Sequence, residues 1–249
     1  MNGRTHIFEN IDALYAALEK QWQLAAHAAI ADHGAFHVAL AGGSTPRNFY
    51  KKLAQQSTVD ASCWHKTHLY FGDERCVPQD HPDSNYRMAK ETLLSVAPLL
   101  PEHVHAMFSA DFSVEQNVAQ YERLLHDTLP LDAGGYPVFD LVLLGMGDDG
   151  HTASLFPDTA ILHESVKPVA AQFVQKLNAW RMSLTFPAIN AASHVAILVV
   201  GDAKAEVLAD IFSAEQDAVV RYPVQQVNPV GQLDWYLDTA AAHLLSVQD

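Results

Sequence analysis

Stretches with the pattern of buried strands alternate with stretches of helical spacing along this chain. Mostly apolar, strand-like runs cover residues 36–40, 68–71, 139–144 and 194–200. Strands that alternate with helices form βαβ units. The pattern therefore predicts an α/β fold, with a mainly parallel sheet flanked by helices. No Ser/Gly/Pro-rich linker and no internal repeat divides the sequence, so we expect a single domain over residues 1–249.

Capping residues, glycine and proline indicate where the helices begin and end. Apolar residues from Ile11 to Ala29 recur at helical spacing, and Gly34 is a plausible end for that helix. The other expected helix starts are Ser44 or Thr45 ahead of Pro46, Ser84, Ser113 in a capping-box pattern with Gln116, Asp202, and Asp234 for a last helix. Residues 182–186 alternate like a half-buried strand.

The charge balance limits the partners that this chain can bind. It has 15 basic and 29 acidic residues, a formal net charge of −14. Such a surface repels nucleic acid and anionic membranes, which bind to clustered Lys and Arg. A small anionic substrate stays possible if the few cations gather in one place. We expect a monomer or a weak homodimer.

Composition is that of an ordinary globular protein. No apolar run approaches the roughly 20 residues of a membrane span, and the sequence MNGRTHIFEN has no signal-peptide apolar region. The two cysteines, Cys63 and Cys76, are not in a CxxC pattern, which argues against a disulfide framework or a cysteine zinc site. We expect a cytoplasmic protein.

The most informative motif is GMGDDGHTASLFP, residues 145–157, directly after the strand-like run 139–144. Ligands bind at the carboxyl ends of strands in open α/β sheets. Asp149 and His151 lie in this turn, and an imidazole beside a carboxylate is suited to general-base catalysis. The alternative is a glycine-rich turn with solvated acids and an incidental histidine.

Three further polar segments follow strand-like runs, and each also has a structural explanation. Residues 41–46, AGGSTP, offer helix-start N–H groups and two hydroxyls for a phosphate, or they are simply a capped helix after a tight turn. Residues 71–75, FGDER, place Asp73 and Arg75 after a strand, where they bind a sugar phosphate or form an ion-paired loop. Lys204 follows the run 194–200 at a helix start, where the helix dipole favours anions, so it serves a ligand or is a solvated lysine.

Arg181 is a further cation, just before the 182–186 run, with no obvious helical partner. The position of these groups at strand ends is more informative than any one of them. A doubly wound sheet brings such loops to one edge, so a phosphate site, cations and an Asp–His base are expected to face one cleft.

Five strings of this sequence closely resemble the 6-phosphogluconolactonases, the lactone hydrolases of the pentose phosphate pathway. They are LAGGSTPRNFYKKLA, FGDERCVPQDHPDSNYRMAKETLL, DLVLLGMGDDGHTASLFP, RMSLTFPAIN and VVGDAKAEVL. The resemblance covers nearly the whole chain. It implies a Rossmann-like α/β domain related to glucosamine-6-phosphate isomerases and deaminases, a phosphosugar lactone as substrate, and no cofactor or metal.

The resemblance also implies roles for individual residues. His151 matches the histidine that is thought to activate water, and Asp149 matches the acid that orients it. Gly42, Gly43, Ser44 and Thr45 match the GGST loop, and Arg75, Lys204 and, less directly, Arg181 match phosphate contacts. Asp73 matches the first acid of the GDER string. Asp148 departs from the family, which often has a neutral residue or Pro there, and we interpret it as a solvated loop acid.

Two other functions remain as alternatives. A glucosamine-6-phosphate deaminase or isomerase would use the same scaffold with Asp73 as the base at a ring carbon. Those enzymes tend to carry a Glu shortly after DGH, whereas this sequence reads SLFP with no acid until Asp158. A non-catalytic sugar-phosphate sensor that regulates transcription usually carries a DNA-binding helix pair, for which this acidic chain has no spare residues.

Overall fold

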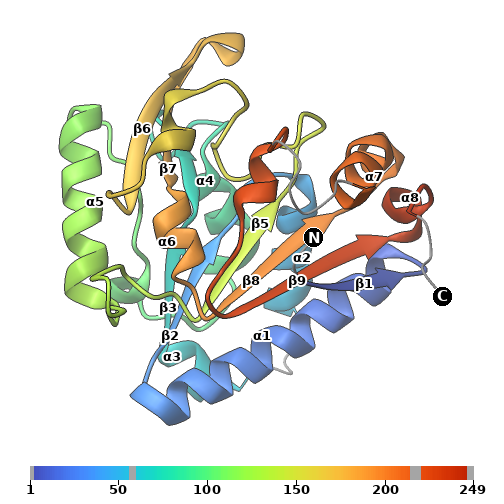
Figure 1. Ribbon diagram of the computed structural model, residues 1–249. Coiled ribbons are helices and arrows are strands. Elements are labelled where there is room, and N and C mark those ends of the chain that lie inside the picture. Colours follow the sequence, from blue (N-terminus) through green and yellow to red (C-terminus); the bar gives the residue numbers. More distant parts are fainter. Residues whose placement is uncertain (1–2, 56–59, 214–219, 246–249) are drawn as a thin grey trace.

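The structure, a computed structural model, describes residues 3–55, 60–213 and 220–245. Within these residues the larger sheet has six parallel strands in the order β1-β9-β8-β5-β2-β3 (Figure 1). These strands are β1 (Arg4–Phe8), β2 (Phe36–Leu40), β3 (Thr67–Phe71), β5 (Leu141–Gly145), β8 (His194–Val199) and β9 (Gln232–Asp238). The predicted α/β fold with a mainly parallel sheet is confirmed.

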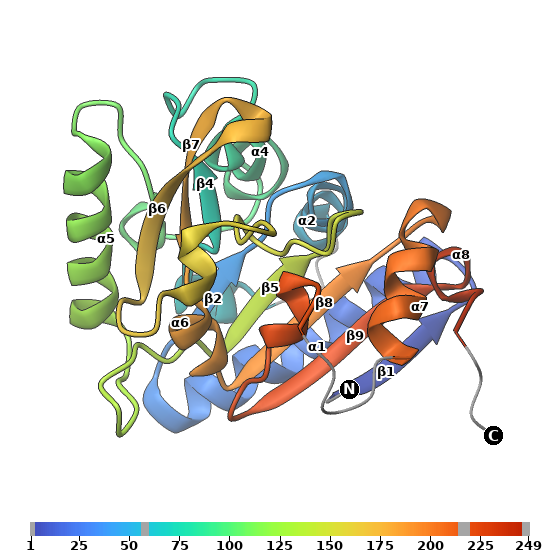
Figure 2. The ribbon, with the colours of Figure 1, turned by 45° about the horizontal axis from the view of Figure 1, so that its top comes forward.

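The helices that accompany the sheet differ greatly in length. They are α1 (Ile11–His33), α2 (Ser44–Gln55), α3 (Ala61–His65), α4 (Asn85–Ala89), α5 (Val114–Thr128), α6 (Phe186–Asn190), α7 (Ala205–Ser213) and α8 (Thr239–Ala242). A π-helical turn, η1 (Lys90–Leu94), continues α4. Shorter 3₁₀ turns are η2 (Pro101–His103), η3 (Ala160–His163), η4 (Gln175–Leu177), η5 (Asp202–Lys204) and η6 (Pro223–Gln226). Figure 2 shows that α1 and α7 cover opposite faces of the large sheet.

The long helix α1 ends and packs as its sequence predicts. Gly34 closes it with a left-handed φ of 90°, and its N–H bonds to the Ile30 carbonyl. Trp22 is fully buried and meets the ring of Phe36 on β2 edge-on, with centroids 5.3 Å apart. This contact fixes α1 against β2, next to the edge strand β3.

A second sheet in the described chain has three antiparallel strands, β4 (Asp73–Arg75), β7 (Ala179–Leu184) and β6 (Val169–Val174). Strands β6 and β7 form a hairpin whose tip is η4, and α5 packs beside β6 at the left in Figure 1. The sequence does not predict the strands β4 and β6, or the edge strand β1, because none of them has the apolar run or the alternation that identifies a strand. The small sheet matters for function because β4 carries the Asp73–Arg75 segment.

The expected helix from Asp234 is wrong, because residues 232–238 form β9. The alternation of the sequence is weak there because β9 lies between β1 and β8, so that Leu233 to Leu237 are all buried. The last helix starts only at Thr239, where the Asp238 side chain accepts from the Ala241 N–H. Asp234 instead accepts hydrogen bonds from Arg4 and contacts the rings of two histidines, His6 and His194.

Three other boundaries differ from the sequence prediction. Strand β7 spans Ala179–Leu184, so Arg181 lies within it, and the chain turns into α6 at Phe186 because Pro187 suits a first helical turn. Asp202 caps no helix but begins the 3₁₀ turn η5, and α7 starts at Ala205. Neither Ser44 nor Thr45 precedes α2 as a cap, since the helix begins at Ser44 itself.

Candidate active site

A cavity of about 270 Å³ opens at the carboxyl ends of β2, β5 and β8. Segments that are far apart in sequence line it, since parallel strands end at one edge of the sheet. The lining residues are Ala41, Gly42, Gly43, Ser44, Thr45, Pro46, Asp73, Arg75, Gly145, Met146, Gly147, His151, Ala153, Leu198, Val200 and Lys204. Eight of the ten residues that the sequence proposes for the site therefore line one cavity, and a ninth, Asp149, contacts His151 without lining it.

The loop between β2 and α2 contributes backbone rather than side-chain chemistry. Gly43 has a φ of 99°, which glycine adopts without strain. A Cβ on Gly42 would lie 2.3 Å from the Asn85 side-chain oxygen, so only glycine fits there. Helix α2 then begins at Ser44, and its first N–H groups have no partner within the helix. Their position at the cavity wall suits an anion such as phosphate.

The imidazole of His151 is held by Asp149. His151 Nδ1 lies 2.5 Å from Asp149 Oδ1, and the His151 backbone N–H also donates to this oxygen, at 3.2 Å. A carboxylate only accepts, so the ring carries its proton on Nδ1 and leaves Nε2 as the free acceptor. Partial burial alone raises the pKa of Asp149, but hydrogen bonds from Lys176 and His151 outweigh it and lower this pKa to about 2. The acid is therefore ionised at neutral pH.

The turn around this pair provides space and a stacking partner for the imidazole ring. A Cβ on Gly147 would lie 2.1 Å from His151 Nδ1, so glycine makes the space that the ring occupies. The Gly147 N–H donates to the His151 carbonyl at 2.8 Å and closes the loop. Phe156 stacks on the imidazole with ring centroids 4.3 Å apart. Asp148, in the same turn, is exposed to solvent, as its position predicts.

Asp73 and Glu74, the two acids of β4, have different functions. Asp73 lines the cavity and is itself buried, and it accepts hydrogen bonds from Ser154 Oγ at 2.7 Å and Asn85 Nδ2 at 3.2 Å. Glu74 accepts from the N–H groups of Asn85 and Tyr86 at 2.7 and 2.8 Å and so caps α4. Burial raises the pKa of Glu74, although these N–H groups oppose the shift. Only Asp73 is placed to contact a ligand.

The three proposed cations lie on three elements, β4, η5 and β7. Arg75 lines the cavity and donates from a guanidinium nitrogen to the Asp83 carbonyl, and Lys204 lines it from η5. Arg181 is the cross-strand partner of Arg75 and is not among the lining residues. Burial, followed by the charge of Arg75, lowers the pKa of Arg181. Arg181 therefore adds positive charge beside Arg75 on the neighbouring strand, without lining the cavity.

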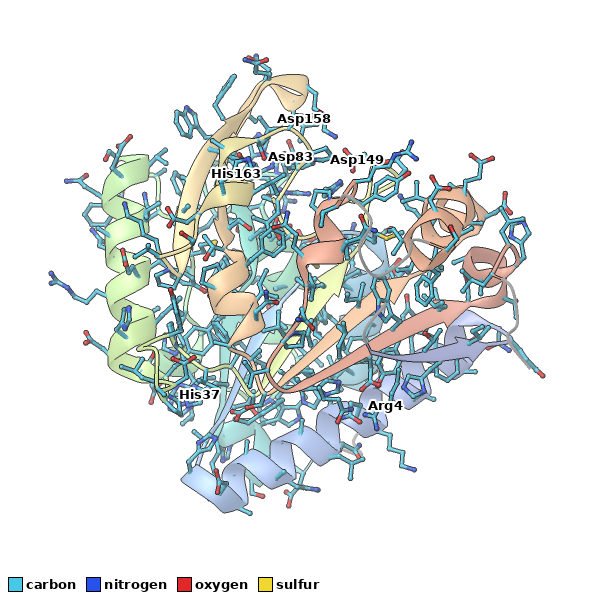
Figure 3. The ribbon with its side chains drawn as sticks, in the orientation of Figure 1. Arg4, His37, Asp83, Asp149, Asp158 and His163 are labelled. Carbon is cyan, nitrogen blue, oxygen red and sulfur yellow. The ribbon has the colours of Figure 1, made fainter. Side chains whose placement is uncertain are left out.

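Lys176, at the tip of the β6–β7 hairpin, is a further residue of the site that the sequence does not predict. Its ammonium pairs with Asp149 Oδ2. Nothing in the local sequence indicates this contact, because the hairpin brings together residues 27 positions apart. Figure 3 shows Asp149 near the top of the molecule, whereas His37 and Arg4 lie toward the opposite end of the sheet.

Within the ranges that the structure describes, His, Cys, Asp and Glu side chains form no group of three or more that could hold a metal ion. None of the helices in the described part of the chain has the length and apolar character needed to cross a bilayer.

The chain is similar to known proteins over most of its length. The chain is 42% identical over 217 residues to a 6-phosphogluconolactonase of Synechocystis sp., covering 87% of this chain and 88% of the relative. A solved 6-phosphogluconolactonase from Trypanosoma brucei superposes with a TM-score of 0.86 at 28% identity, over 98% of this chain and 99% of that chain. A monomeric glucosamine-6-phosphate deaminase, 17% identical with a TM-score of 0.77 over 97% of this chain and 99% of that chain, shares the fold.

The family described as "Glucosamine-6-phosphate isomerases/6-phosphogluconolactonase" matches residues 9–235. This match includes every strand that ends at the cavity and all ten of the proposed site residues. The chain belongs to the glucosamine-6-phosphate isomerase/6-phosphogluconolactonase family.

Proposed function

We propose that this protein hydrolyses 6-phospho-D-glucono-1,5-lactone to 6-phospho-D-gluconate, the second step of the oxidative pentose phosphate pathway. The observation that carries the proposal is that His151, polarised by Asp149, lines the same cavity as Arg75 and Lys204. Hydrolysis of a phosphosugar lactone requires a base to activate water and a cationic site to bind the phosphate. The relatives from Synechocystis and Nostoc, 42% and 41% identical, are named for this activity.

The phosphate of the substrate is expected at the cationic wall of the cavity. Arg75 and Lys204 supply charge, and the N–H groups at the start of α2 supply hydrogen bonds, with Ser44 and Thr45 beside them. Arg181, opposite Arg75 on the neighbouring strand, strengthens the positive field. Binding the dianion far from the reacting carbon fixes the ring, and this binding energy assists the chemical step.

Hydrolysis then needs one proton transfer in each direction. His151 Nε2 takes a proton from a water molecule as its oxygen bonds to C1, and the carbonyl oxygen becomes an oxyanion. The ionised Asp149 stabilises the imidazolium that forms. The C1–O5 bond then breaks, and the proton returns from His151, or comes from water, to the ring oxygen. Backbone N–H groups of a glycine loop or a nearby cation face the oxyanion.

The deaminase alternative needs a base at a ring carbon, for which Asp73 is the candidate. Both oxygens of Asp73 already accept hydrogen bonds, from Ser154 and Asn85. Ser154 stands in the SLFP string, where the deaminases tend to carry their Glu nearby. These contacts favour a role for Asp73 in holding sugar hydroxyls.

The proposal is tested with lactone generated in the cuvette and corrected for spontaneous hydrolysis. The wild type should accelerate formation of 6-phosphogluconate in a coupled dehydrogenase assay. His151→Asn should lose about 10³-fold in kcat and still bind 6-phosphogluconate. Wild-type protein with no acceleration, or His151→Asn with full turnover, overturns the assignment.

Two parallel measurements separate the alternatives. Ammonia release from glucosamine 6-phosphate identifies a deaminase. A melting shift with 6-phosphogluconate but no hydrolysis identifies a sensor.

The setting of the reaction is also proposed. The acidic surface and the cysteine usage support a cytoplasmic enzyme that acts on a small molecule without nucleic acid or membrane. A monomer or weak homodimer is proposed, and light scattering after gel filtration at several concentrations checks it. A concentration-independent tetramer would contradict it.

A further inference from the structure

The β6–β7 hairpin reaches from the small sheet to the Asp149–His151 pair. Lys176, in η4 at the hairpin tip, pairs with Asp149 Oδ2, while His151 holds Oδ1. The Lys176 ammonium also lies 4.7 Å from the centroid of the Phe156 ring. That ring in turn stacks on the imidazole of His151. One lysine thus contacts both groups that surround the imidazole.

We propose that Lys176 is a positioning residue for the reaction, which fixes the Asp149 carboxylate and the Phe156 ring so that His151 presents its free nitrogen to the cavity. This inference rests on the proposed lactonase function. A lysine of the small antiparallel sheet would then hold the carboxylate that orients a base in the loop after β5 of the large sheet.

Lys176 does not have the features of a substrate-binding residue. It is not among the residues that line the cavity, whereas Arg75 and Lys204 are. Half of its side chain is exposed, 51% by area, on the outer side of Asp149. Its effect on the substrate therefore passes through Asp149 and Phe156.

The hairpin is held in place firmly enough to position a side chain. Strands β6 and β7 pair over six residues, from Val169 opposite Leu184 to Val174 opposite Ala179. Asn178 closes the tip with a left-handed φ of 48°. The side chain of Gln172 on β6 donates to the Ser154 carbonyl at 2.9 Å, three residues after His151. The Gln172 contact thus joins the hairpin to the chain just after the His151 turn.

Removing the ammonium changes the electrostatics of the pair in a defined direction. The carboxylate of Asp149 contacts both the Lys176 ammonium and the His151 imidazole. The ammonium partly neutralises the carboxylate, so without Lys176 the carboxylate stabilises a protonated imidazole more strongly. The Asp149–His151 pair then binds a proton more readily, because a cation that opposed protonation is gone. The other charged groups around the cavity, Asp73, Arg75 and Lys204, stay in place.

The experiment compares Lys176→Met with Lys176→Arg and with Lys167→Met. Lys167 is exposed and precedes β6, so its replacement removes the same charge without touching the site. For Lys176→Met we expect kcat to fall about three- to tenfold and KM to change less than about twofold. The acid limb of the kcat/KM profile should move to higher pH by roughly half a unit or more. Lys176→Arg should restore most of kcat, and Lys167→Met should behave as wild type.

A second readout does not depend on turnover. Nitrogen-15 NMR of the His151 ring, assigned with His151→Asn, should show its titration at higher pH in Lys176→Met than in wild type. If this shift occurs in a protein without lactonase activity, the positioning role of Lys176 is supported and the proposed function is wrong. If KM rises while kcat and both titrations stay unchanged, Lys176 binds substrate and the inference is overturned. Unchanged kinetics and unchanged titrations also overturn it.

Discussion

His151 Nδ1 lies 2.5 Å from Asp149 Oδ1, two residues earlier in the same turn. The pair is therefore local in sequence, unlike Lys204, which reaches the cavity from 53 positions after His151. The geometry of the Asp149–His151 pair depends on one turn, whereas the position of Lys204 relative to His151 depends on the packing of the whole sheet.

Replacing Asp149 with Asn should abolish most catalysis without loss of product binding. An amide can turn its NH₂ toward Nδ1, which then becomes the acceptor and leaves the proton on Nε2. We expect kcat to fall by about 10²- to 10⁴-fold. Steady-state kinetics with calorimetry of 6-phosphogluconate binding checks this, and a loss of affinity with unchanged kcat would contradict it.

Replacing Lys204 with Met should chiefly weaken substrate capture. Lys204 contacts the cavity from η5 and makes no contact with the Asp149–His151 pair, so it is expected to bind the phosphate. The expected result is a rise in KM of about 10- to 100-fold with a smaller change in kcat. Lys20→Met on the exposed side of α1 is the control for loss of one positive charge. An unchanged KM would place the phosphate elsewhere.

Replacing Gly147 with Ala should displace the imidazole. The added Cβ would lie 2.1 Å from His151 Nδ1 and 2.9 Å from Asp149 Oδ1, so the pair has to move. We expect kcat to fall at least about 10²-fold with little change in the far-ultraviolet circular dichroism. Gly145→Ala, where a Cβ meets nothing within 4 Å, should cost far less. Equal kcat values in the two variants would show that the contact at Gly147 is unimportant.

The stability of the protein should fall in mild acid because of histidines far from the site. His37, His68 and His105 gather near the amino ends of β2 and β3, with the His37 and His68 rings 4.9 Å apart and His68 Nδ1 3.1 Å from His105 Nε2. Burial, followed by neighbouring histidines, lowers the pKa of His37 to about 3 and the pKa values of His68 and His105 to about 4.

The sign follows from proton linkage. Between about pH 6.5 and 4 the unfolded chain protonates these rings and the folded protein does not, so stability is full above about pH 6.5 and decreases as the pH falls. Between pH 7 and 5 we expect Tm to drop by roughly 5 °C. His105→Asn should reduce the drop, measured as the difference in Tm between the two pH values. The same drop in wild type and variant would contradict a role for this histidine cluster.

The parallel strands and long helices could be predicted from the sequence because their signals are local. The strands β2, β3, β5 and β8 lie within two residues of the expected runs, and Gly34 ends α1 as predicted. The capping box of Ser113 and Gln116 is also present. In each case a few neighbouring residues determine the structure.

The failures concern residues whose structure depends on distant neighbours. Asp234 resembles a helix cap, but pairing with β1 and β8 makes it part of a strand. Likewise, the contact between Lys176 and Asp149 exists only because a hairpin of the small sheet folds over the His151 turn.

The order of strands in the large sheet has a consequence for synthesis on the ribosome. Strand β8, which leads to Lys204, lies between β5 and β9, and β9 is the last strand to be made. A nascent chain that ends before residue 232 therefore leaves one edge of β8 unpaired next to the Lys204 loop. Every residue that lines the cavity has been made once Lys204 has left the ribosome, but the strand that pairs with β8 beside it is completed only at residue 238.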